Sequence, residues 1–195
     1  MGRLVLVLMV PLFMSGCAIV GGVAGAAVEG VVYMFKGEEE SFSISMRSAL
    51  VAAQRGLRKA DLEVDVLEPV ENGYEIGFGN KNLTGQIALK RQTSSLTTME
   101  VKVRAGAMRE DSIERALLVS IREQSKRAKN SDKFSFRGYK YIREKEDAKS
   151  KRVGWYRPGA MLDVKKIGKS EWLRIKMPSG KQAFIKGELA GFTGK

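Results

Sequence analysis

The chain has 195 residues, a formal net charge of +12, no histidine and a single cysteine. The absence of histidine removes the usual general base and the commonest metal ligand, and a lone cysteine excludes any disulfide within the chain. Composition therefore excludes serine–histidine and cysteine–histidine catalysis, and each domain must be stabilised by its own core.

Residues 1–16 have the layout of a secretory signal peptide. Arg3 supplies the positive start, residues 4–13 are apolar, and small residues precede Cys17. The apolar run alone is too short to span a hydrocarbon core of ~30 Å. An uncleaved membrane helix with a buried cysteine is the alternative.

The residues Met14, Ser15 and Gly16 before Cys17 resemble the lipobox of bacterial lipoproteins, which prefers leucine at the position of Met14. The resemblance implies cleavage before Cys17 and acylation of both its thiol and its new amino group. Several acyl chains on one residue anchor a protein stably. Ala18 stands where aspartate causes inner-membrane retention in enterobacterial lipoproteins, so the resemblance implies a lipid anchor on the periplasmic face of the outer membrane.

Residues 17–35 follow as a membrane-proximal segment rich in glycine and alanine. Gly22, Ala26 and Gly30 recur every four residues. On a helix they would form a flat stripe against which another helix could pack closely. A flexible tether of small residues explains the same pattern, and both interpretations stay open.

Residues 36–124 predict an α+β domain. Apolar residues at helical spacing indicate helices over 46–60 and 113–121, the second with a capping box of Asp111 and Glu114. Alternating apolar residues indicate strands around 42–44, 62–66, 74–78, 87–89 and 99–103. The expected arrangement is an antiparallel sheet of four or five strands with two helices on one face.

Parts of residues 16–124 resemble a small bacterial lipoprotein family of unknown function. The matching stretches are Gly16-Cys17, 21–27, Tyr33, Lys36-Gly37-Glu38, the helix with Ala49-Leu50, 83–87 and 103–106. The family brings no known activity, so the resemblance implies an envelope location and no chemistry.

The positive charge lies in the C-terminal part of the chain. Residues 36–124 hold 13 Lys/Arg and 14 Asp/Glu, a net charge of −1, whereas residues 125–195 hold 20 and 7, a net charge of +13. Residues 125–133 are predicted to be a basic linker and residues 134–195 a second domain. A solvated basic surface without a dedicated partner is the plain interpretation. The alternative is a contact with anionic envelope material such as phospholipid, lipopolysaccharide or peptidoglycan.

Three short strand-like stretches in residues 159–164, 168–175 and 178–185 predict a small barrel. They resemble bacterial SH3 domains, whose signature runs Gly-x-x-Leu-x-Val, Trp-x-x-Val and Gly-x-x-Gly-Trp-Val. Phe184 stands where that signature has tryptophan, and Ala183 where it has glycine. The resemblance covers about 134–190 and places residues 144–158 in a loop. The predicted fold class is therefore an α+β sheet with two helices on one face, followed by a small all-β SH3-like barrel.

Barrels of this type bind extended ligands in aromatic-lined grooves. The resemblance makes Tyr141, Trp155, Tyr156 and Trp172 candidates for such a groove, although Trp172 would serve equally well in the core. Residues 133–143 interleave basic and aromatic side chains as single-stranded nucleic-acid binders do. A strand with a glycine bulge explains that spacing too, and an exported protein rarely meets nucleic acid, so we expect no nucleic-acid partner.

No catalytic, cofactor or metal site is predicted. The carboxylates of residues 38–40 stand at a strand entrance, and Asp61, Glu63 and Asp65 have the period of a solvated strand face. The sequence thus predicts a non-enzymatic envelope lipoprotein whose basic SH3-like module binds cell-wall peptide, an anionic polymer or a protein partner. The alternative is a structural lipoprotein that oligomerises through its Gly/Ala-rich segment.

Overall fold

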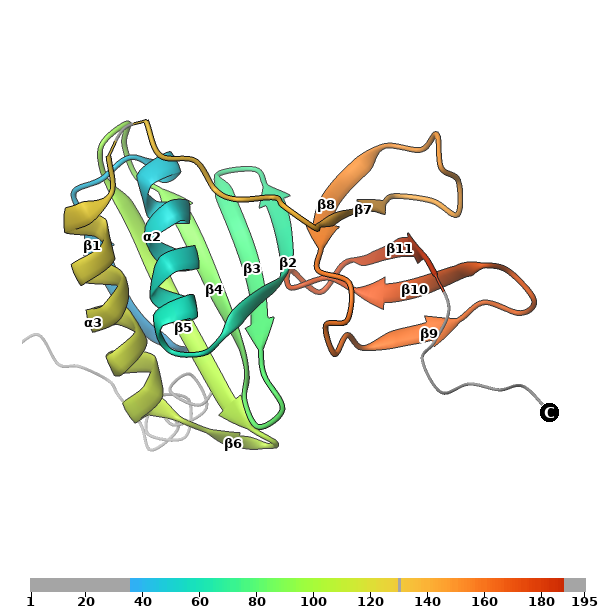
Figure 1. Cartoon of the computed structure of the whole chain (residues 1–195), viewed down its shortest axis with the longest axis horizontal. Helices are drawn as coiled ribbons and strands as arrows, with labels where there is room; N and C mark the ends of the chain where they lie inside the picture. Colours follow the sequence, from blue (N-terminus) through green and yellow to red (C-terminus); the bar gives the residue numbers. More distant parts are fainter. Residues whose placement is uncertain (1–35, 130, 188–195) are drawn as a thin grey trace, which may run out of the picture.

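The structure is a computed structural model that describes residues 36–129 and 131–187. In these residues eleven antiparallel strands form one continuous sheet, and two helices lie together over one end of it (Figure 1). The predicted signal peptide, the lipobox, Cys17 and the Gly/Ala-rich segment lie outside the described residues.

The first part of the chain contains β1 (Glu38–Phe42), α2 (Met46–Lys59), β2 (Glu63–Val70), β3 (Gly73–Gly79), β4 (Thr84–Arg91), β5 (Thr97–Ala105), β6 (Met108–Arg109) and α3 (Asp111–Arg127). The second part contains β7 (Lys140–Arg143), β8 (Arg152–Tyr156), β9 (Val164–Lys166), β10 (Trp172–Lys176) and β11 (Gln182–Lys186). The strand order across the sheet is β1-β5-β4-β3-β2-β8-β7-β11-β10-β9, and β6 pairs with β5.

Helix α2 begins at a serine cap and buries an alanine-rich face. The Ser45 hydroxyl accepts a hydrogen bond from the Ser48 backbone N–H at 3.3 Å, which satisfies one of the donors that a helix start leaves unpaired. Ala49, Ala53 and Leu57 are fully buried. The helix predicted over 46–60 is therefore confirmed, together with its apolar face.

Helix α3 packs closely on α2, and its start differs from the prediction. A Cβ on Gly56 of α2 would lie 2.7 Å from Ile121 Cγ1 of α3, so the glycine permits the close approach. The predicted capping box of Asp111 and Glu114 is wrong. Glu110, and not Asp111, occupies the cap position, and it makes no side-chain cap hydrogen bond. The Glu114 carboxylate does not cap the helix start, because it accepts hydrogen bonds in the interior from Arg109, Val103 and Glu38.

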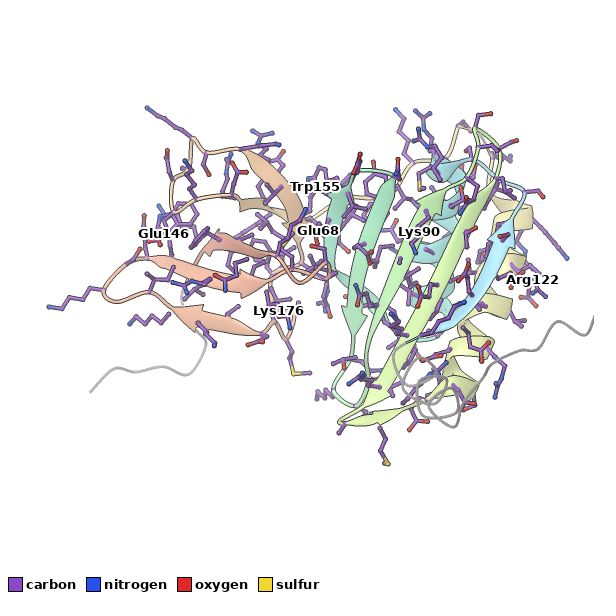
Figure 2. The ribbon with its side chains drawn as sticks, turned by 180° about the vertical axis from the view of Figure 1, so that it is seen from behind. Glu68, Lys90, Arg122, Glu146, Trp155 and Lys176 are labelled. Carbon is purple, nitrogen blue, oxygen red and sulfur yellow. The ribbon has the colours of Figure 1, made fainter. Side chains whose placement is uncertain are left out.

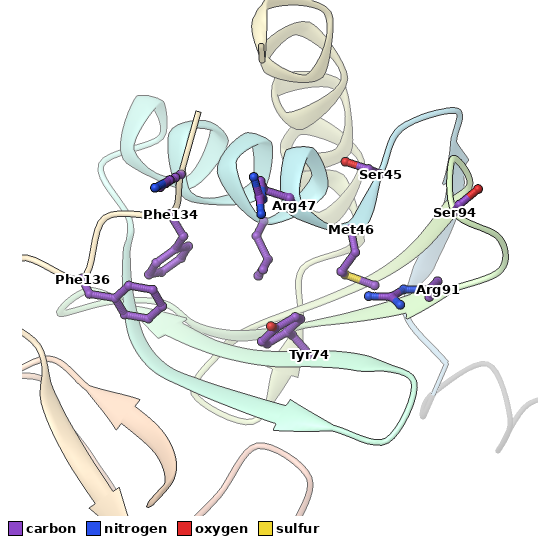
Figure 3. A pocket seen from close by; sticks show the side chains of 10 residues that line it. Ser45, Met46, Arg47, Tyr74, Arg91, Ser94, Phe134 and Phe136 are labelled. Atoms are coloured by element: carbon purple, nitrogen blue, oxygen red, sulfur yellow. The ribbon is translucent and has the colours of Figure 1, made fainter. Parts of the chain in front are cut away.

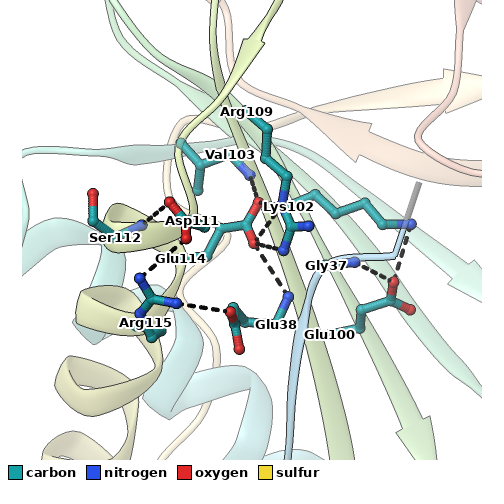
Figure 4. A network of polar contacts seen from close by, with 10 residues as sticks. All are labelled: Gly37, Glu38, Glu100, Lys102, Val103, Arg109, Asp111, Ser112, Glu114 and Arg115. Carbon is teal, nitrogen blue, oxygen red and sulfur yellow. Dashed lines mark hydrogen bonds and ion pairs between the residues drawn. The ribbon is translucent and has the colours of Figure 1, made fainter. Parts of the chain in front are cut away.

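Two carboxylates, one fully buried and one half-buried, hold the first described residues to the sheet (Figure 4). Glu114 is fully buried. Its oxygens accept from Arg109 Nη2 at 2.6 Å, from the Val103 N–H at 3.0 Å and from the Glu38 N–H at 3.2 Å. Beside it, Glu100 Oε1 accepts from the Gly37 N–H at 3.0 Å. The chain therefore enters β1 through backbone groups that side chains of α3 and β5 hold.

The predicted fold class is wrong. Residues 134–187 do not close into a separate SH3-like barrel, because β8 pairs with the outer edge of β2 and extends the first sheet. Val66 pairs with Tyr156 and Leu67 with Trp155. Trp155 and Tyr156 were assigned to a loop, and the strand that they form in the structure is the one that joins the two parts of the sheet. Trp155 and Glu68 lie at this junction (Figure 2).

A β-bulge in β2 lets this strand serve two cores. The register shifts between Val64 and Val66, and a bulge re-aims the side chains that follow it. Val64 therefore packs in the first core, with the helices, whereas Val66 packs in the second core. The second core also contains Ile142, Tyr156, Leu173, Met177 and Ile185. Simple alternation had placed Val64 and Val66 on one face.

The bulge also buries Asp65, which was expected on a solvated strand face. Its Oδ1 lies 2.6 Å from Arg157 Nη2, and the same guanidinium pairs with Glu63 at 3.0 Å as an ion contact without hydrogen-bond geometry. Burial raises the pKa of Asp65, and the hydrogen bond from Arg157 offsets part of that rise. The carboxylate is thus a partner of Arg157 at the junction.

Tyr139 closes the same junction by donating its hydroxyl to the Val64 carbonyl at 2.7 Å. Burial raises the pKa of Tyr139 to about 12. Between pH 10 and 12 the unfolded state loses this proton and the folded state keeps it, so rising pH favours unfolding.

We expect Tyr139→Phe to lack this dependence of stability on pH. In urea unfolding, the stability difference between wild type and variant should shrink by up to about 2 kcal/mol from pH 9 to pH 12. An unchanged difference would show that the hydroxyl titrates normally.

Candidate anion-binding face

The four aromatic residues predicted to form a groove do not share one exposed surface, although Tyr141 and Trp155 are register partners. Tyr156 and Trp172 are both 8 % exposed and belong to the interior. The Trp155 ring packs on Phe136 with centroids 4.7 Å apart. Only Tyr141, which is 45 % exposed, presents its ring to solvent.

The reason lies in the strand pattern. Trp172 lies in β10 and Tyr156 in β8, so the sheet positions both rings. The Tyr156 hydroxyl also donates a hydrogen bond to the Lys186 carbonyl at 3.3 Å. Burial raises the pKa of the Tyr156 hydroxyl. Both rings therefore serve packing, and the surface that remains is the one around Tyr141.

A row of five residues, four of them cations, crosses the second part of the sheet beside Tyr141. We call it the basic row, and its members are Lys165 (β9), Arg174 (β10), Phe184 (β11), Arg143 (β7) and Arg152 (β8). Each is the register partner of the next. Residues paired in register point to the same face of a sheet. Four of the five positions are therefore cations on one face of five adjacent strands.

The basic row lies on the face opposite the second core. Leu173 and Ile175 flank Arg174 in β10, and Ala183 and Ile185 flank Phe184 in β11; all four are buried in that core. Side chains alternate between the faces of a strand. The row is thus held in a fixed geometry by the packing behind it.

The electrostatics of the row favour an anionic partner. The Arg152 guanidinium carbon lies 4.0 Å from the Tyr141 ring centroid and that of Arg143 lies 5.8 Å away, so the ring faces the two cations. In the described part of the chain, no carboxylate forms an ion pair with a cation of the row, and Arg143 donates a hydrogen bond to the Ser150 carbonyl. Residues 134–187 hold 15 Lys/Arg and 5 Asp/Glu, a net charge of +10.

A second cross-strand row, which the sequence did not reveal, is acidic. Glu68, Glu75, Glu100 and Glu39 lie in register across β2, β3, β5 and β1, with Ala88 of β4 between the second and third. Their face is opposite the helices. The β10–β11 turn folds back onto it, where the Ser179 hydroxyl donates to Glu68 Oε1 at 2.6 Å.

The acidic side chains are already engaged. Gln86 donates to Glu75 at 3.0 Å and to the Pro178 carbonyl at 2.7 Å, and burial raises the pKa of Glu75. Burial would also raise the pKa of Glu100, but the Gly37 N–H and the Lys102 ammonium outweigh it and the pKa is lowered. These carboxylates fix the turn and the β1 edge in place.

No protein-family model matches the chain, and no curated protein matches it. Within residues 36–129 and 131–187, no three His, Cys, Asp or Glu side chains are grouped so as to hold a metal ion. Over the same residues, neither helix has the length and apolar character needed to cross a membrane.

Proposed function

We propose that the chain is a non-enzymatic, lipid-anchored envelope lipoprotein that binds the anionic polymer of the cell wall through the basic row. The anchor is supported by the resemblance of residues 14–17 to a lipobox. The observation that carries the binding proposal is the alignment of Lys165, Arg174, Arg143 and Arg152 on one face, without paired carboxylates.

The spacing of the row suits an extended ligand. Neighbouring strands lie ~4.8 Å apart, so the cations repeat along a line across five strands. Guanidinium groups pair with carboxylates through two parallel hydrogen bonds, and peptidoglycan carries carboxylates at intervals on its stem peptides. Phe184 and Tyr141 add ring surface for its neutral parts. The proposal therefore keeps the predicted partner class and replaces the aromatic groove by a basic sheet face.

Co-sedimentation of the full chain with purified peptidoglycan sacculi tests the proposal. We expect retention at low salt that weakens at moderate salt, because exposed charges are screened. The double variant Arg143→Gln/Arg174→Gln should bind about tenfold more weakly, which corresponds to about 1.4 kcal/mol. The control Lys90→Gln/Arg104→Gln removes two exposed cations from the first part of the sheet and should bind as wild type.

Two results would overturn the proposal: no retention of the wild type at low salt, or equal losses of binding in the two double variants.

The anchor is tested separately by labelling cells with a radioactive fatty acid, where wild type should carry label and Cys17→Ala should not. The alternative, oligomerisation through the Gly/Ala-rich segment, concerns residues outside the described part of the chain.

A further inference from the structure

A groove lies on the first part of the molecule, and its residue Phe136 stacks on Trp155 of β8. It has a volume of about 850 Å³ and lies between the first turns of α2, strand β3 and the segment 133–136 (Figure 3). Its apolar lining consists of Met46, Leu50, Tyr74, Phe134 and Phe136. This volume is typical of sites for small molecules.

The two ends of the groove differ in chemistry. At one end Arg91, Ser94, Ser45 and Met46 gather, and at the other end lie the rings of Phe134 and Phe136 (Figure 3). Ser45 caps the start of α2, where the helix dipole is positive. One end of the groove is thus polar and holds Arg91, the other is aromatic with Lys133 next to Phe134 in the chain, and Arg47 lies between them.

The cations of the groove are available to a ligand. Arg47, Arg91 and Lys133 line it, and none of its ten lining residues is a carboxylate. In the described part of the chain no carboxylate forms an ion pair with these three side chains. Three unpaired cations around an apolar surface attract an anion that also carries an apolar part.

The aromatic end is preorganised. The Phe136 side chain is 42 % exposed, yet its ring is held by neighbours. Its centroid lies 4.8 Å from that of Phe134, 4.7 Å from that of Trp155 and 6.4 Å from that of Tyr139. An exposed ring fixed in this way offers apolar surface without the cost of ordering it on binding.

We propose that this groove binds a single-chain anionic amphiphile. Its phosphate or carboxylate would lie between Arg47 and Arg91, and its alkyl chain would run over Leu50 and Tyr74 to Phe134 and Phe136. The occupant follows from charge complementarity at one end and apolar surface at the other. The groove and the basic row share no residue, so either proposal can fail alone.

The test is a titration of the full chain with decyl phosphate below its critical micelle concentration, followed by NMR of ¹³C-methyl methionine. Met46 lines the groove, and Met177 is buried in the second core and serves as the internal reference. We expect the Met46 signal, assigned with Met46→Leu, to shift saturably while that of Met177 stays in place. Arg47→Gln/Arg91→Gln should weaken binding about tenfold, and Arg143→Gln/Arg174→Gln should leave it unchanged.

Two further probes separate the parts of the ligand. Decyl maltoside has the chain without the charge and should bind at least about tenfold more weakly than decyl phosphate. Inorganic phosphate has the charge without the chain and should leave Met46 unshifted at the same concentration. The proposal is overturned if decyl phosphate does not shift Met46, if the maltoside binds equally well, if phosphate alone reproduces the shift, or if the folded Arg47→Gln/Arg91→Gln variant binds as wild type.

Discussion

Replacing Glu114 with alanine is expected to lower the free energy of unfolding by about 3–5 kcal/mol, the usual cost of removing one partner of a buried ion pair. The carboxylate is fully buried against Arg109, which keeps 19 % of its side chain exposed. The variant removes the Glu114 carboxylate from the Arg109 guanidinium, and the backbone N–H groups of Val103 and Glu38 lose it as an acceptor. An unsatisfied buried donor adds a desolvation cost of its own.

Urea unfolding followed by far-UV circular dichroism measures this loss. Glu123→Ala on the same helix is the matched control, because both side chains of its pair with Lys59 are exposed and such pairs contribute little to stability. The double variant Arg109→Leu/Glu114→Leu should regain part of the loss, since it removes both charges of the pair. A cost below about 1 kcal/mol for Glu114→Ala would mean that the network contributes no more than a surface pair.

Gly154→Val is expected to cost about 3 kcal/mol and to loosen the joint between the two parts of the sheet. Gly154 lies in β8, and a Cβ there would stand 2.7 Å from the Leu67 carbonyl oxygen of β2 and 3.1 Å from Met177 Cε. Backbone atoms in a ladder cannot move without breaking its hydrogen bonds. The valine must therefore push β8 away from β2 where Leu67 pairs with Trp155.

Trp155 packs against the first core at the β2–β8 joint, and Trp172 is buried in β10, so tryptophan fluorescence reports on the joint and on the second part of the sheet. In Gly154→Val we expect the fluorescence transition at lower urea than the circular dichroism transition, whereas wild type shows coincident transitions. Gly187→Ala is the control, because a Cβ there meets nothing within 4 Å. Coincident transitions and an unchanged midpoint in Gly154→Val would contradict a rigid β2–β8 joint.

Local patterns predicted the elements better than their assembly. Helical spacing located α2 and α3, and alternation located β3, β4 and β5, because each pattern depends only on neighbouring residues. The β2–β8 pair depends on which edge accepts which strand, and no local pattern carries that information. Trp155 and Tyr156 also precede Arg157-Pro158, which favoured a loop and concealed the joining strand.

The candidate site shows the same division. Composition predicted a basic region and an anionic partner, but the basic row depends on the register of five strands. Arg143 and Arg174 are 31 positions apart in the sequence and meet only through Phe184. The sequence could not show which of the candidate aromatic residues are exposed. Trp172 and Tyr141 both lie in short strands, but Trp172 is buried and Tyr141 is exposed.

The way the chain enters β1 has a mechanical consequence. If the protein is held by a lipid before residue 36 and by a polymer at the basic row, tension is applied at opposite ends of the strand order. The load would then peel β1 from β5 one hydrogen bond after another, and Gly37 and Glu38 would be strained first. Their backbone N–H groups are the ones that Glu100 and Glu114 accept from. Under such a load these two carboxylates would determine the force at which β1 begins to separate from β5.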